Sequence, residues 1–73
     1  MLMKATPQQV EKLLKGNHNF SQFGFSMMMT RLKGDYAKDA SPATVQHATS
    51  EVNKFLAKFS SIMAADFAVI QKL

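Results

Sequence analysis

The sequence predicts an all-α fold of three helices, in which two shorter helices pack against a long C-terminal helix. Two dipeptides, Thr6-Pro7 and Ser41-Pro42, each place an N-cap residue before a proline at the first helical position. The apolar residues after them recur at the three- and four-residue spacing of a helix. No Gly or Pro follows Pro42, so neither of the two helix-breaking residues divides the last segment. Residues 1–73 are expected to form a single domain.

The first helix is expected at residues 7–15. Thr6 and Gln9 have the spacing of a capping box, in which each side chain binds the backbone N–H of the other residue. A short apolar stripe follows, and Gly16 is expected to end the helix.

The second helix is expected at residues 20–33, between the turn-forming Asn17-His18-Asn19 and Gly34. Its apolar residues fall on two nearly opposite faces. The first face carries Phe25, Met28, Met29 and Leu32, and the second carries Phe20, Phe23 and Met27. In a chain this small, we expect the first face to join the core and the second to contact another molecule.

The third helix is expected at residues 42–72. Its apolar stripe is unbroken and centred near Phe59, so Phe55 and Phe59 are predicted to lie in the middle of the core. Ser60-Ser61 offers a second N-cap, and a break at these serines is the alternative to one continuous helix.

The composition excludes several classes of protein. With 47% hydrophobic and 19% charged residues, the chain is too apolar and too weakly charged to remain disordered. The absence of Cys fits a reducing compartment, so a cytoplasmic location is expected. Residues 1–4 do not have the pattern of a signal peptide. No apolar run approaches the roughly 18 residues that a membrane span requires.

Side chains suited to catalysis or metal binding are few and scattered. His18 lies between two asparagines in a turn, where a surface or capping role is the interpretation. His47 and Glu51 lie one helical turn apart, yet two ligands do not make a metal site. Together with Lys54 and Lys58 they are interpreted as a solvated stripe. We therefore expect no catalytic residue, no cofactor and no metal.

Asp66 is the one charged residue near the centre of the long apolar stripe. A buried carboxylate without a partner would cost several kcal/mol, so we expect a partner for it. The candidates are Arg31, Lys33, a helix N-terminus and a second copy of the chain. Asp66 is predicted to fix the alignment of the helices. The alternatives are a role in a ligand or partner site, and a break at Ser60-Ser61 that turns Asp66 into solvent.

These patterns favour a small helical module for protein–protein interaction or self-association, without catalytic activity. A core of this size rarely supplies more than about 3–5 kcal/mol of net stability. A homodimer or another protein partner is therefore expected, with no membrane span. The candidate interaction residues are Phe20, Phe23, Met27, Asp66, Phe67 and Ile70.

The alternative is a small DNA-binding or DNA-associated regulator. Ser41-Pro42-Ala43-Thr44-Val45 resembles the S-x-x-T-V opening of the recognition helix in the helix-turn-helix family. The resemblance covers five residues and implies a nucleic-acid partner for the helix that begins there. Such motifs usually place a small residue and then a Gly before the Ser, where this chain has Asp35 and Asp39. The net charge of +4 is modest and its basic residues are scattered.

Overall fold

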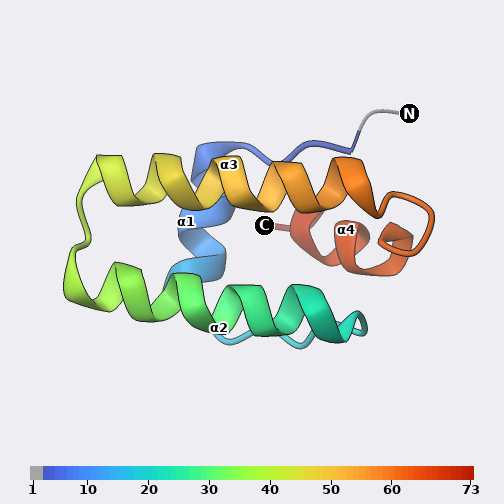
Figure 1. The fold of residues 1–73 in the computed structure, drawn as a ribbon, viewed down its shortest axis with the longest axis horizontal. Coiled ribbons are helices and arrows are strands. Elements are labelled where there is room, and N and C mark those ends of the chain that lie inside the picture. The colour runs from blue at the N-terminus through green and yellow to red at the C-terminus, as the bar shows by residue number, and fades with distance from the viewer. Residues whose placement is uncertain (1–2) are drawn as a thin grey trace.

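The computed structural model describes residues 3–73, and in that range it contains four helices and no strand. The helices are α1 (Pro7–Lys15), α2 (Phe23–Lys38), α3 (Pro42–Lys58) and α4 (Ala64–Gln71), shown in Figure 1. The all-α prediction is confirmed. The predicted count of three helices is wrong, because the segment expected at residues 42–72 forms two helices.

The two predicted N-caps are confirmed. The Thr6 side chain accepts a hydrogen bond from the Gln9 backbone N–H, and the Gln9 side chain accepts one from the Thr6 N–H. The Ser41 hydroxyl accepts a hydrogen bond from the Thr44 N–H. A proline begins both helices, where a backbone N–H would have no partner within the helix. Gly16 follows α1 in an extended conformation.

Helix α2 begins and ends later than the predicted range of 20–33. It starts at Phe23, after the Gln22 side chain accepts a hydrogen bond from the Phe25 N–H at 2.6 Å. It continues through Gly34 to Lys38. A glycine disfavours a helix by only about 1 kcal/mol relative to alanine, which the packing of the following turn is sufficient to offset. Tyr36 in that turn packs against the core.

The continuous C-terminal helix is a wrong prediction, and the break near Ser60-Ser61 that was its alternative is present. Helix α3 ends at Lys58, and the chain turns through residues 59–63 before α4 begins. The serines do not cap the new helix. Its N-cap is Met63, whose side chain makes no capping hydrogen bond. The break is therefore imposed by packing rather than by a local capping signal.

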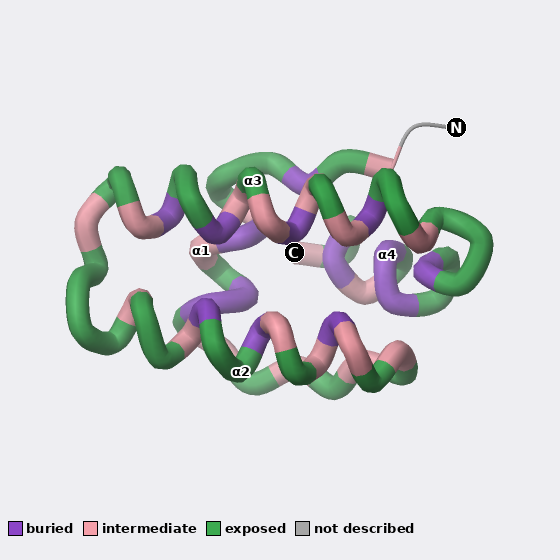
Figure 2. Tube along the Cα trace, viewed as in Figure 1, coloured by how far each residue is buried: buried purple, intermediate pink, exposed green. Residues whose placement is uncertain are grey.

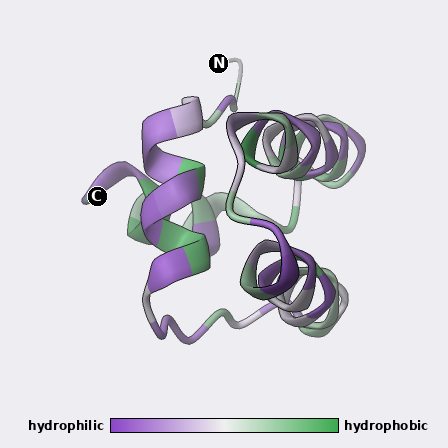
Figure 3. Cartoon of the chain, turned by 90° about the vertical axis from the view of Figure 1, so that its left-hand side faces the viewer, coloured by the Kyte–Doolittle hydropathy of each residue, from purple (hydrophilic) through white to green (hydrophobic). Residues whose placement is uncertain are grey.

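The helices form two layers. Helices α2 and α3 run side by side in opposite directions, and α1 and α4 lie together on one side of this pair (Figures 1 and 3). Helix α1 contacts all three other helices, so it occupies the centre of the fold. Within residues 3–73, no helix covers the opposite side of the α2–α3 pair (Figure 3).

The core lies between the two layers, as the buried segments in Figure 2 show. All four helices contribute to it. Its largest fully buried side chains are Phe25, Leu13, Leu32, Leu56, Met63, Ile70, Val10 and Val52. Phe55 and Phe59, which were predicted at the core centre, are only half-buried and pack on its edge.

Polar side chains tie the segments together on the side of α1. Asn53 of α3 makes two hydrogen bonds to Ala5, accepting from its N–H at 2.8 Å and donating to its carbonyl oxygen at 3.1 Å. Lys33 of α2 donates to the carbonyl oxygen of Gly16, which follows α1, at 2.7 Å. These contacts place one flank of both α2 and α3 against the N-terminal part of the chain.

Replacing Gly34 by alanine is expected to stabilise the protein. Gly34 lies inside α2 with a negative φ, and an added Cβ meets no atom within 4 Å. The higher helix propensity of alanine should raise the free energy of unfolding by about 0.5–1 kcal/mol, measured by urea denaturation. Gly24→Ala is the control, because its Cβ would lie 3.1 Å from the Gln22 oxygen that caps α2. An unchanged or lower stability of Gly34→Ala would show that α2 ends earlier in solution.

Candidate functional site

The uncovered side of the α2–α3 pair carries a shallow groove of about 210 Å³. We call it the α2–α3 groove. Its lining residues are Met28, Glu51, Lys54, Phe55, Lys58 and Phe59. Met28 lies on the flank of α2 away from Lys33, and Phe55 lies on the flank of α3 away from Asn53, because successive helical residues are about 100° apart. The groove and the α1–α4 layer therefore lie on opposite sides of the helix pair.

A row of phenylalanine rings connects this groove to the core. Phe20 meets the buried Phe25 edge-to-face with ring centroids 4.8 Å apart. Phe25 in turn lies 5.4 Å from Phe55, and Phe55 lies 4.6 Å from Phe59. Aromatic rings at these distances attract one another and favour particular relative orientations. The exposed edges of Phe55 and Phe59 are thus a preformed apolar floor for the groove.

Charged side chains surround that floor. Lys58 Nζ lies 5.6 Å from the ring centre of Phe59, within the range of a cation–π contact. Glu51 Oε1 lies 3.9 Å from both an Arg31 nitrogen and a His47 nitrogen, at the long limit of an ion pair. Within the described residues, no carboxylate lies within 4.0 Å of Lys54 or Lys58. The groove therefore has apolar and charged parts within two turns of α3.

The structure separates the predicted interaction residues. Phe23 and Met27 expose 75% and 58% of their surface on the outer side of α2. Phe20 is half-buried and packs against the core. Phe67 and Ile70 are buried, with 4% and 0% exposure, and belong to the core rather than to the surface.

Asp66 is buried, and its partner is the start of α2. Its Oδ1 accepts hydrogen bonds from the Ser21 N–H at 2.7 Å and the Ser21 hydroxyl at 2.8 Å. Its Oδ2 accepts one from the Gln22 N–H at 2.8 Å. Of the four candidate partners, the helix N-terminus is the one the structure contains. Asp66 is 2% exposed and both of its carboxylate oxygens accept hydrogen bonds from within the chain, which gives it a structural role in the fold.

Sequence reasoning missed the groove because it assigned the two kinds of lining residue to different environments. Phe55 and Phe59 were placed in the core, and Lys54 and Lys58 on an ordinary solvated face. The available signal was the spacing of Glu51, Phe55 and Lys58, which differ by four and three residues and so share one helical face.

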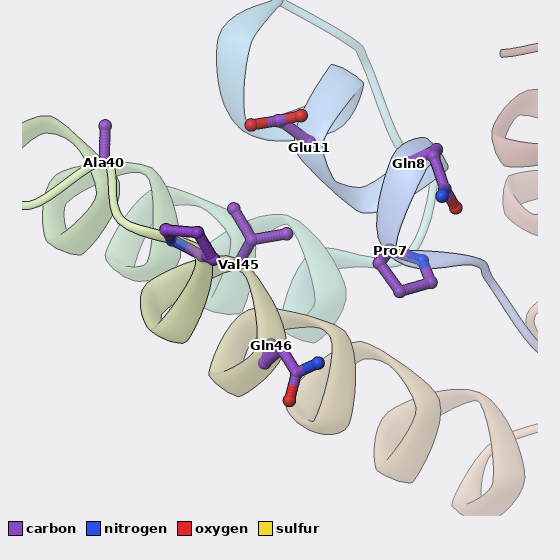
Figure 4. A pocket seen from close by; sticks show the side chains of 7 residues that line it. Pro7, Gln8, Glu11, Ala40, Val45 and Gln46 are labelled. Atoms are coloured by element: carbon purple, nitrogen blue, oxygen red, sulfur yellow. The ribbon is translucent and has the colours of Figure 1, made fainter.

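A second hollow, of about 270 Å³, lies where the first turns of α1 and α3 approach each other (Figure 4). Its walls include Pro7, Pro42 and Val45, with Glu11 at one side. Glu11 Oε2 accepts a hydrogen bond from the Tyr36 hydroxyl at 3.3 Å. The hollow is open and holds one carboxylate, which gives it no arrangement of groups for catalysis.

In the part of the chain that the structure describes, no three His, Asp or Glu side chains are grouped as metal ligands. Across residues 3–73, no helix combines the length and apolar character that crossing a membrane demands. Comparison of the chain with protein-family models, with curated proteins and with solved structures finds no match. The functional proposal therefore rests on the groove itself.

Replacing Asp66 by asparagine is expected to destabilise the fold. The substitution keeps the shape but turns one acceptor oxygen into an NH₂ group that faces a donor, either at Ser21 or at Gln22. A hydrogen bond to a charged group contributes roughly 1.5–3 kcal/mol, so we expect a loss of about 2 kcal/mol in the free energy of unfolding. Urea denaturation of the purified variant measures it.

Asp35→Asn is the matched control for this measurement. Asp35 is exposed, and its nearest basic group is Arg31 at 4.0 Å. Its replacement should change the stability by less than about 0.5 kcal/mol. Equal unfolding midpoints for the two variants would contradict the structural role given to Asp66.

Proposed function

We propose that the chain is a helical protein–protein interaction module without catalytic activity, and that it self-associates through the α2–α3 groove. The observation that carries this proposal is the apolar floor formed by Met28, Phe55 and Phe59, on the side of the helix pair that no other helix of residues 3–73 covers. Apolar surface of this kind is removed from water when a partner docks on it.

The exposed side chains on α2 support the same location. Met27 directly precedes the groove residue Met28 in the sequence and lies about 100° further around the helix. Phe23 lies one turn before Met27, and both side chains are exposed. Both are candidate interaction residues from the sequence, and together with the groove they extend the apolar surface across the outer side of α2. A partner that covered both would bury more apolar area than the groove alone offers.

The helix-turn-helix alternative gains no support from the arrangement of the helices. Helices α2 and α3 run side by side in opposite directions (Figure 1), whereas the two helices of that motif cross at about 90–120°. The face of α3 that carries Lys54 and Lys58 has no arginine and includes Glu51, which is unfavourable for contact with phosphates.

Introducing a charge into the groove should weaken self-association. In Met28→Lys the new ammonium group replaces an apolar floor residue, and we expect the dimer dissociation constant to rise at least about tenfold because that group would be desolvated at the interface. Sedimentation velocity over a range of protein concentrations measures the constant.

Ile62→Lys is the matched control for this experiment. Ile62 is 54% exposed in the turn after α3 and does not line the groove. The same chemical change there should leave the dissociation constant unaltered. A wild-type chain that sediments as a monomer up to hundreds of micromolar would contradict the proposal, and equal effects of both variants would place the interface elsewhere.

A further inference from the structure

We infer that the occupant of the α2–α3 groove is a second copy of the chain, whose α3 lies antiparallel to the first and is aligned by Glu51 of each copy against Lys58 of the other. This inference rests on the proposed self-association and specifies its geometry. The observations behind it are the spacing of Glu51 and Lys58 on α3, the ring of Phe55 between them, and the lack of a carboxylate within 4.0 Å of Lys58 in the described residues.

Glu51, Phe55 and Lys58 lie on one face of α3 and all line the groove. Along the helix axis, Glu51 lies about 6 Å before Phe55 and Lys58 about 4.5 Å after it, at 1.5 Å per residue. The face therefore has an acidic end, an aromatic centre and a basic end. A two-fold axis beside the aromatic centre brings each acidic end next to the basic end of the other copy.

The same alignment also brings apolar residues of the two copies into contact. Gly24 of α2 lies opposite Phe55, since a Cβ on Gly24 would be 3.5 Å from the ring. Met28 is one turn further along α2, which is the level of Glu51 on the antiparallel α3. The two-fold arrangement that brings Lys58 of one copy next to Glu51 of the other therefore also brings Phe59 of one copy close to Met28 of the other. Ionic and apolar contacts agree on one register.

A second copy fits these charges better than a partner with a single sign of charge. An acidic partner would place carboxylates beside Glu51, and a basic partner would place cations beside Lys58. Lys58 has no carboxylate within 4.0 Å in the described chain, and Glu51 has only long contacts of 3.9 Å. Lys58 therefore has no ion-pair partner in the described chain, whereas Glu51 would meet Lys58 of the other copy in addition to Arg31 and His47.

Two charge-reversal variants test the register. Glu51→Lys alone makes both ends of the face basic, and Lys58→Glu alone makes both ends acidic, so each variant meets two like-charge pairs when it self-associates. We expect each dissociation constant to rise about tenfold or more, since every pair changes from attraction to repulsion. An equimolar mixture of the two variants restores two attractive pairs. Native mass spectrometry with one variant isotope-labelled should then show predominantly mixed dimers.

Lys72→Glu is the matched control, because it makes the same change of charge as Lys58→Glu away from the groove. Lys72 is exposed just after α4, in the layer on the other side of the α2–α3 pair, and it does not line the groove. Its dissociation constant should equal that of the wild type. Circular dichroism melts of all variants confirm that each chain remains folded.

The outcomes separate the register from the self-association that underlies it. Weakened single variants with a recovered mixture support the register. A dimer that is indifferent to Glu51 and Lys58, or two weakened variants that do not recover when mixed, overturns the register but leaves self-association intact. A wild-type chain that is monomeric at every concentration overturns both.

Discussion

The position of α4, and through it much of the fold, depends on the buried contact between Asp66 and the backbone before α2. A carboxylate away from water is costly unless hydrogen-bond donors surround it, and here three donors from Ser21 and Gln22 do so. To reach them, the C-terminal segment has to fold back beside α1. A straight helix over residues 42–72 would carry Asp66 away from the start of α2. The turn at residues 59–63 is the geometric consequence of this contact.

The same contact organises the beginning of α2. Asp66 accepts a hydrogen bond from the Gln22 N–H, and the Gln22 side chain in turn accepts one from the Phe25 N–H. These hydrogen bonds position Phe25, which is fully buried in the first turn of α2, so that its ring contacts the ring of Phe55. A polar contact at the edge of the core thus fixes the rings that lead from the core to the groove. The polar residue specifies alignment, and the apolar residues supply most of the free energy.

The parts of the fold that were predictable from the sequence are those that local chemistry decides. Thr6 and Ser41 cap their helices with their own side chains, so their positions follow from a few neighbouring residues. Gly34 does not end α2 as the sequence predicts, because the intrinsic cost of a glycine in a helix is small and the residues that offset it lie elsewhere in space. The turn after Lys58 likewise depends on residues that are distant in the sequence. An apolar stripe is compatible with one helix or two, and Asp66 decides between them through residues more than forty positions earlier in the chain.

The candidate site was harder to predict than the fold because periodicity identifies an apolar face without identifying what covers it. Phe55, Phe59 and Phe67 all belong to the stripe of the third predicted helix. The structure buries Phe67 in the core with 4% exposure, yet leaves Phe55 and Phe59 half-exposed. The difference arises from α1, which packs on one side only of the α2–α3 pair. No pattern within a single helix contains that information.

The break after α3 also limits the length of the exposed apolar surface on that helix. Because α4 takes Phe67 and Ile70 into the core, the apolar surface on α3 is confined to the two turns that end at Phe59. A short apolar surface can be aligned with a partner in several ways at similar free energy, since apolar contact has little directional preference. Charges at its ends remove that ambiguity, because every misaligned arrangement leaves them unpaired or beside a like charge. Glu51 and Lys58 stand at those ends, so in the proposed dimer it is these two charges on α3 that would set the register.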